Sequence, residues 1–135
     1  MDGQRDRAAS SAAYGETERL PKVETMAPNP RSPYAASKLA GEQLLEAWAH
    51  SYGMQTVSLR YFNVFGPRQP AGSAYAAAIP QFCAAIRNGK RPLIFGDGEQ
   101  TRDFTFVACA VLATMQAGGI DRAFVTLHVG PGTFR

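Results

Sequence analysis

The chain has 135 residues, of which 45% are hydrophobic and 19% are charged. This balance is typical of a globular protein with a moderate core, and the length suits one domain. The formal net charge is +3, and the basic residues are scattered along the chain without a basic run. The charge pattern therefore does not indicate a nucleic-acid partner, although two or three of these cations could bind a small anion.

The cysteines and histidines give no sign of a metal centre. Two cysteines, Cys83 and Cys109, are too few for a disulfide framework, and their spacing is not that of metal ligands. His50 and His128 are solitary. No apolar run approaches the ~20 residues that a membrane span needs. The N-terminus also lacks the apolar core of a signal peptide. We therefore expect no metal, no membrane partner and a cytoplasmic location.

The first third of the chain predicts one long helix preceded by irregular structure. Residues 1–7 are polar and aperiodic, which predicts a disordered tail. Residues 8–15 are typical of the end of a buried strand that runs into a loop. Residues 16–31 hold three prolines and many charges, which predicts a surface loop. Residues 34–52 carry apolar side chains at helical spacing and precede a glycine, which predicts a helix. We expect its Trp48 and Tyr52 side chains to lie in the core of the protein.

The remainder alternates between strands and helices. Residues 56–62 are rich in β-branched and aromatic side chains, and a strand directly after a helix indicates an α/β fold. Residues 63–73 predict an irregular loop beyond the carboxyl end of that strand, where open α/β sheets bind ligands. The remaining patterns predict helices over residues 79–88 and 107–117, and strands over residues 92–95, 101–107 and 123–129.

Residues 32–42 read SPYAASKLAGE and hold a candidate catalytic pair. Ser32 can cap a helix, and Pro33 suits its first turn. Tyr34 and Lys38 follow one helical turn apart, so they lie on one face. A fixed cation beside a phenol favours the phenolate, which is a base. The same spacing also arises by chance on a solvated helix face, so the pair alone leaves both interpretations open.

Four stretches in a fixed order are more specific than any one of them: AASSAAYG at 8–15, SPYAASKLAGE at 32–42, RYFNVFGPRQ at 60–69 and PLIFGDGEQTRDFTFV at 92–107. In this order they resemble the extended short-chain dehydrogenase/reductase family, and within it the NAD-dependent epimerases and dehydratases of nucleotide sugars. The similarity is greatest to the UDP-glucose and UDP-N-acetylglucosamine 4-epimerases. It implies a partial Rossmann-like α/β fold, with the C-terminal part of the parallel sheet in residues 8–62 and a partial sugar-nucleotide-binding region in residues 63–135.

The resemblance assigns catalytic roles to three residues. Tyr34 would be the catalytic base, and Lys38 would hold the nicotinamide ribose of NAD and favour the phenolate. Ser10 would hydrogen-bond the substrate oxygen that loses and regains a proton. Phe62 would lie near the nicotinamide. Taken alone, Ser10 could equally be a polar group at a strand end, and Phe62 a core residue.

The resemblance also implies a UDP-sugar as substrate. Asn63 and Arg102 would bind its diphosphate, a task that suits guanidinium geometry. The backbone from Leu93 to Phe95 and the Phe95 ring would receive the uracil. Each assignment has an ordinary alternative, since Asn63 could cap a turn, Arg102 could be a surface residue and Phe95 could belong to the core.

The implied reaction inverts C4 of a UDP-hexose through a transient 4-keto sugar, with NAD as the redox cofactor. Family members that eliminate water carry an Asp-Glu pair directly after the catalytic hydroxyl residue, and the decarboxylases keep a Glu. Ser11 and Ala12 occupy those positions here. We therefore favour a 4-epimerase, with a dehydratase or decarboxylase of the same family as the alternative.

The sequence departs from the family pattern at the cofactor. It contains no glycine-rich dinucleotide turn, which brings a helix N-terminus to the pyrophosphate. Residues 4–7 are charged or polar where an apolar strand is expected. We therefore expect a fragment with an uncovered inner helix face, marginal stability and weak NAD binding. A non-catalytic remnant is the alternative. Family members commonly dimerise through the helix that carries Tyr and Lys, so a homodimer is a further expectation.

Overall fold

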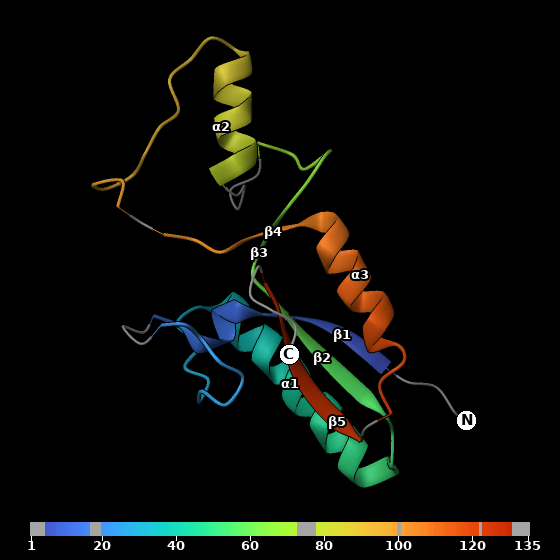
Figure 1. The fold of residues 1–135 in the computed structure, drawn as a ribbon. Helices are drawn as coiled ribbons and strands as arrows, with labels where there is room; N and C mark the ends of the chain where they lie inside the picture. The colour runs from blue at the N-terminus through green and yellow to red at the C-terminus, as the bar shows by residue number, and fades with distance from the viewer. Residues whose placement is uncertain (1–4, 17–19, 73–77, 100, 122, 131–135) are drawn as a thin grey trace.

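The computed structural model describes residues 5–16, 20–72, 78–99, 101–121 and 123–130 (Figure 1). Within these ranges the elements run in the order β1 (Arg5–Ser10), the 3-10 helix η1 (Ser11–Tyr14), α1 (Pro33–Tyr52), β2 (Thr56–Tyr61), β3 (Asn63–Phe65), α2 (Ala78–Arg87), β4 (Phe104–Phe106), α3 (Val107–Ala117) and β5 (Phe124–Val129). Strands and helices alternate through most of this order, which confirms the predicted α/β class.

Three of the strands form a parallel sheet in the order β1-β2-β5. The separate pair β3-β4 is also parallel. Because the strands of the larger sheet are parallel, their carboxyl ends lie at one edge, where Ser10, Tyr61 and Val129 are in register. Ligands of open α/β sheets bind at this edge.

The two faces of the larger sheet differ in chemistry. One face packs against α3 and is apolar, with the buried residues Val57, Leu59, Val129, Ala110, Ala113 and Ala117. On the opposite face, toward α1, β2 presents polar side chains. Thr56 Oγ1 donates to the carbonyl oxygen of Leu45 at 3.4 Å, and Arg60 forms an ion pair with Glu42. The alternation of apolar and polar residues in β2 therefore reflects two differently covered faces.

α1 begins and ends where its sequence signals predict. Ser32 Oγ accepts a hydrogen bond from the backbone N–H of Ala35 at 3.1 Å, and Pro33 occupies the first turn. Gly53 ends the helix with a left-handed backbone at φ 64°, a conformation that favours glycine. Local capping chemistry alone thus fixes both ends of the helix that carries Tyr34.

Two expectations about the start of the chain and α1 are wrong. Arg5–Arg7, assigned to the disordered tail, lie in β1, while residues 1–4 of that tail are outside the described residues. β1 is an edge strand of the described sheet, and the Arg7 side chain is exposed. Arg7 lies so close to Gly41 that a Cβ added at Gly41 would be 2.2 Å from the Arg7 Nε. The inner face of α1 is also covered, with these residues buried: Ala35, Gly41, Glu42, Leu45 and Ala49.

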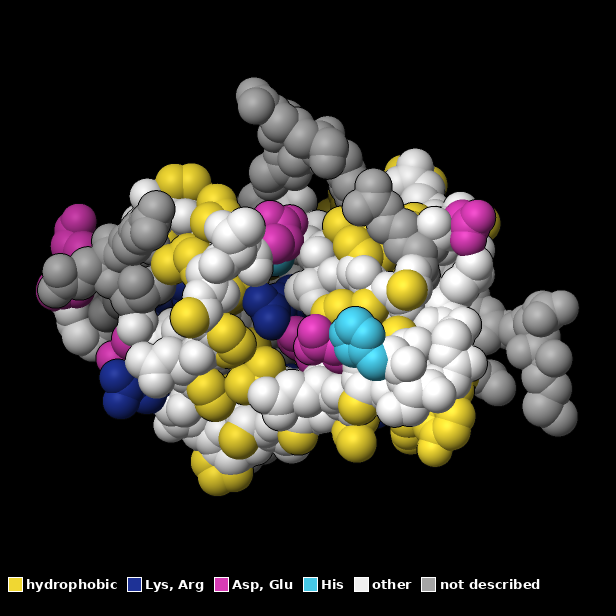
Figure 2. Space-filling view, turned by 90° about the horizontal axis from the view of Figure 1, so that it is seen from below, with side chains coloured by type: hydrophobic (Ala, Val, Ile, Leu, Met, Phe, Trp, Pro, Cys, Tyr) yellow, Lys and Arg dark blue, Asp and Glu magenta, His cyan; other side chains and the backbone are white. Residues whose placement is uncertain are grey.

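The predicted core residues of α1 are exposed instead. Trp48 is 43% exposed and Tyr52 is 74% exposed, so neither belongs to the core. Together with Leu44, they form a separate apolar stripe on the helix, since the buried residues lie on another face. The space-filling view shows hydrophobic side chains at several places on the surface (Figure 2). Spacing alone could not distinguish the two faces, because both repeat every three or four residues.

Three predicted elements differ in extent. Residues 92–95 form no strand, and the side chains of Leu93, Ile94 and Phe95 are exposed. Residues 63–65 form β3 rather than an irregular loop, and the strand predicted over residues 101–107 is reduced to β4. β3 and β4 are stabilised by pairing with each other, with Asn63 opposite Phe104. The predicted boundary at residue 62 stays a prediction.

Candidate active site

The predicted Tyr34–Lys38 pair lies on one face of α1. The Lys38 Nζ is 5.7 Å from the centroid of the Tyr34 ring, and the tyrosine is 55% exposed. The same Nζ donates a hydrogen bond to the carbonyl oxygen of Ala8 in β1 at 3.3 Å. The ammonium is therefore held between the phenol and a strand, which fixes a positive charge beside a group that a ligand can reach.

Ser10 ends β1, two residues after the carbonyl that Lys38 contacts. Its Oγ accepts a hydrogen bond from the backbone N–H of Ala12 at 3.2 Å, and the residue is half-buried. This contact makes Ser10 the cap of η1 and fixes the direction of its hydroxyl. Ser10 and the Tyr34–Lys38 pair thus reach the same end of β1 from the strand and the helix.

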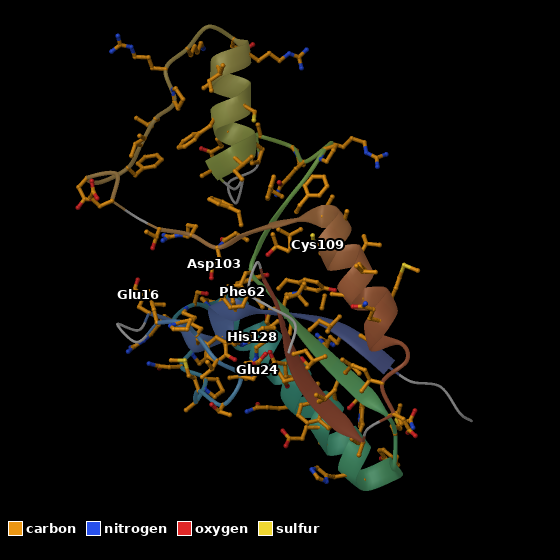
Figure 3. All side chains as sticks on the ribbon, in the orientation of Figure 1. Glu16, Glu24, Phe62, Asp103, Cys109 and His128 are labelled. Atoms are coloured by element: carbon orange, nitrogen blue, oxygen red, sulfur yellow. The ribbon has the colours of Figure 1, made fainter. Side chains whose placement is uncertain are left out.

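Phe62 and Asn63 follow β2 at the carboxyl edge. The backbone N–H and side-chain Nδ2 of Asn63 both donate to the carbonyl oxygen of Asp103, at 3.2 and 3.0 Å. Asn63 therefore lies beside the segment that carries Arg102, whose Nη1 donates to the carbonyl of Thr101 at 2.7 Å. The structure brings the two predicted diphosphate residues onto neighbouring segments. Figure 3 shows Phe62 and Asp103 at the same end of the sheet.

Leu93 and Phe95, the predicted uracil contacts, are not brought to this edge. They are 69% and 73% exposed, and they lie in the segment between α2 and β4. Figure 1 shows this segment extending away from the sheet. Their role stays a prediction.

A groove lies between α2 and the segment after β3, which is part of the stretch 63–73 that the sequence places where α/β sheets bind ligands. Its volume is about 630 Å³. Its apolar wall includes Phe65 and Phe106, whose ring centroids are 5.6 Å apart, and its polar residues include Arg68 and Arg87. None of the predicted site residues lines it.

A buried ion pair joins α1 to β2. Arg60 Nε lies 3.0 and 2.9 Å from the two carboxylate oxygens of Glu42, and Arg60 Nη2 lies 2.6 Å from Oε2. Burial disfavours the charged guanidinium, but the hydrogen bonds and the charge of Glu42 raise the pKa of Arg60 above its ordinary value. The guanidinium also lies 4.6 Å from the centroid of the Tyr14 ring.

Tyr14 continues this polar cluster to His128 and Glu24. The Tyr14 hydroxyl is 2.6 Å from His128 Nε2, and Glu24 Oε1 accepts the backbone N–H of His128 at 3.1 Å. Burial raises the pKa of Tyr14 and lowers the pKa of His128. Burial alone would raise the pKa of Glu24, but hydrogen bonds from backbone N–H groups lower it.

No local sequence pattern marks this cluster, because the partners of His128 are distant from it in the chain. Only the positions of the residues could have indicated the cluster, since Tyr14 closely follows β1 and His128 lies near the end of β5. Carboxyl ends of parallel strands meet at one edge. Among the described residues no group of three or more His, Cys, Asp or Glu could hold a metal ion. The same ranges contain no helix that is both long enough and apolar enough to cross a membrane.

The parallel sheet with α1 and α3 on its two faces defines a Rossmann-like α/β protein. The profile of the NAD dependent epimerase/dehydratase family matches residues 7–122. The chain belongs to this family, as its four ordered stretches predict.

Three relatives illustrate the similarity. The UDP-glucose 4-epimerase of Mycolicibacterium smegmatis is 40% identical over 126 residues, which cover 93% of this chain and 40% of that protein. A UDP-N-acetylglucosamine 4-epimerase from Methanobrevibacter ruminantium, in complex with UDP-N-acetylmuramic acid, has a TM-score of 0.92 and 45% identity, covering 96% of this chain and 42% of its own. A UDP-glucuronic acid 4-epimerase from Bacillus cereus, in complex with UDP-glucuronic acid and NAD, has a TM-score of 0.83 and 31% identity, covering 96% and 40%. The chain thus spans about two fifths of the relatives it matches.

Proposed function

We propose that this chain supplies the catalytic base, its neighbouring cation and part of the substrate-binding surface of a UDP-sugar 4-epimerase. The observation that carries the proposal is the Tyr34–Lys38 pair, whose ammonium is held by the Ala8 carbonyl while the phenol is exposed. The similarity to 4-epimerases supports a UDP-hexose as the substrate. The absence of carboxylates at Ser11 and Ala12 favours epimerisation over elimination of water or decarboxylation.

Each residue then has a defined task. Tyr34 takes the proton from the C4 hydroxyl of the sugar, and Ser10 hydrogen-bonds the same oxygen. Lys38 stabilises the negative charge that develops on the phenol oxygen. After the 4-keto sugar turns over, Tyr34 returns the proton to the oxygen. Asn63 and Arg102 hold the diphosphate while the sugar ring turns, and Leu93 and Phe95 receive the uracil.

The carboxyl edge fits the nicotinamide end of NAD. Tyr34 is exposed, Lys38 lies one turn along the same face, and Phe62 follows β2 at this edge. Lys38 would hold the ribose and Phe62 would lie beside the nicotinamide. When bound, NAD supplies the hydride transfer at C4. The 135 residues contain no glycine-rich turn for the pyrophosphate, so we expect them to bind NAD weakly.

Product analysis tests the proposal. The 135-residue chain is incubated with millimolar NAD and either UDP-glucose or UDP-N-acetylglucosamine, and the products are identified by ¹H NMR. We expect slow formation of the C4 epimer, at a rate that rises with NAD concentration. A 4-keto-6-deoxy sugar would support a dehydratase instead. No product at any NAD concentration would support a non-catalytic remnant.

A homodimer through α1 stays part of this proposal. The exposed apolar residues Leu44, Trp48 and Tyr52 support it, because they form a stripe on the helix that carries Tyr34 and Lys38.

A further inference from the structure

We propose that His128 is a positioning residue of this site, which ties the segment 20–31 to the end of β5 and holds Phe62 and Tyr14 in place. The inference rests on the proposed function, because Phe62 is assigned to the nicotinamide there. In that scheme Tyr34 and Ser10 act on the C4 oxygen of the sugar, and the imidazole itself contacts neither of them. Its effect on the reaction is therefore indirect, through the groups that flank them.

The His128 ring is in contact with three separate parts of the chain. Its Nε2 lies 2.6 Å from the Tyr14 hydroxyl in η1, and its ring meets the Phe62 ring edge-on, with centroids 5.2 Å apart. Glu24 Oε1 lies 3.7 Å from its Nδ1 and also accepts the His128 backbone N–H at 3.1 Å. Figure 3 shows Phe62, His128 and Glu24 following one another at this end of the sheet.

These partners fix the hydrogen-bond direction. A carboxylate can only accept, so Glu24 favours the tautomer of His128 with its proton on Nδ1. Nε2 is then the acceptor of the Tyr14 O–H. The three residues form an ordered chain from Glu24 through His128 to Tyr14. A proton added to Nε2 would turn this acceptor into a donor and force the Tyr14 hydroxyl to reorient.

Two partners of His128, Glu24 and Phe62, connect it to the proposed active site. The segment with Glu24 continues into Ser32, which caps α1 two residues before Tyr34. It is also fastened to η1, because the backbone N–H of Asn29 donates to the Ala13 carbonyl at 2.8 Å. On the other side, Phe62 directly precedes Asn63. The state of His128 therefore affects the approach to α1 and the ring assigned to the nicotinamide.

Three charged groups and one phenol act on the imidazole. Burial lowers the pKa of His128, and the Arg60 guanidinium on β2 acts in the same direction, while Glu24 and Glu42 on α1 oppose the shift. The phenol of Tyr14 faces it from η1. The folded chain thus favours neutral His128. Neutral His128 therefore contributes to the stability of the folded chain above pH 6.5, the ordinary pKa of histidine. This contribution is lost as the pH falls from 6.5 toward the lowered pKa of His128.

Glu24 also makes the folded chain more stable at higher pH. Its lowered pKa means that the folded chain favours the carboxylate, so its contribution is present above the ordinary value of 4.5 and is lost in more acidic solution. Acid that protonates Glu24 therefore weakens both contacts that join the segment 20–31 to β5, whereas protonation of His128 alone strengthens the contact between its Nδ1 and the carboxylate.

An NMR titration of the full 135-residue chain from pH 8 to pH 5 tests the inference. The ring signals of His128, Phe62 and Tyr34 are followed, with the exposed His50 as a reference in the same sample. We expect the Phe62 signals to move with the His128 midpoint, below pH 6.5. In Glu24→Gln that shared midpoint moves to lower pH, because the carboxylate that favours protonation is gone.

His128→Gln distinguishes positioning from a merely structural role. The glutamine keeps a neutral polar side chain but does not titrate, so the pH step in the Phe62 signals should vanish while the fold is retained. His50→Gln is the matched control and should leave the step unchanged. A Phe62 response that persists in His128→Gln, or that does not follow the His128 midpoint, overturns the inference. If the Phe62 and His128 signals share a midpoint but the chain forms no C4 epimer, the proposed function is contradicted and the positioning role of His128 is not.

Discussion

Replacing Glu42 with alanine is expected to lower the free energy of unfolding by about 3–5 kcal/mol, the usual cost of removing one partner of a buried ion pair. The Arg60 side chain is 7% exposed, so its charge would remain buried without the carboxylate that now binds it through two nitrogen atoms. Most domains are stable by only about 5–15 kcal/mol, so the variant would lose a large share of its stability. Urea unfolding followed by circular dichroism measures the change.

Glu46→Ala is the matched control, because Glu46 lies one turn further along α1 and is exposed. We expect it to change stability by less than about 0.5 kcal/mol. The double variant Glu42→Leu with Arg60→Met should recover much of the loss, since an apolar pair leaves no buried charge unpaired. Equal losses in Glu42→Ala and Glu46→Ala would show that the ion pair contributes nothing specific.

If the chain has the proposed epimerase activity, replacing Tyr34 with phenylalanine is expected to reduce its turnover by about 10²–10⁴-fold, the usual contribution of a positioned acid or base. Only the hydroxyl is removed, and the residue is 55% exposed, so the fold should be unaffected. The Lys38 ammonium would remain near the ring but would have no phenol oxygen to act on. Rates of epimer formation by NMR, at fixed NAD and UDP-sugar, measure the effect.

Tyr52→Phe on the same helix serves as the control. Tyr52 is 74% exposed at the far end of α1, so its hydroxyl should not contribute to turnover. Full activity in Tyr34→Phe would show that another group removes the proton. A similar loss in both variants would point to a general effect on the helix and not to a catalytic hydroxyl.

The parts of the fold that the sequence predicted are those with local signals. α1 was predicted because Ser32, Pro33 and Gly53 mark its ends by capping and turn chemistry within a few residues of each end. β2 was predicted from its β-branched and aromatic side chains, and α3 from a helical pattern over residues 107–117. The Tyr34–Lys38 pair followed directly from helix geometry.

The parts that were missed depend on residues distant in the chain. The partners of His128 are Tyr14, Glu24 and Phe62, at sequence separations that no periodicity can detect. Trp48 was assigned to the core because a helix with two apolar faces does not reveal which one packs. Arg5–Arg7 looked incompatible with a strand only because an edge position could not be foreseen.

The predicted site was only partly assembled by the fold for similar reasons. Asn63 and Arg102 lie on neighbouring segments because β3 pairs with β4, a contact that the sequence did not predict. Leu93 and Phe95 were assigned by resemblance, and the segment that holds them extends away from the sheet. The nearness of a residue to the site thus depended on strand pairing, which sequence motifs alone do not specify.

The most direct test of the central claim is turnover in D₂O with NAD supplied, followed by NMR of the hydrogen at C4 of the sugar. If Tyr34 exchanges only the oxygen-bound proton while the hydride leaves and returns at C4, the epimer keeps protium at C4, and its formation requires NAD. An epimer that carries deuterium at C4, or one that forms equally well without NAD, would contradict the account.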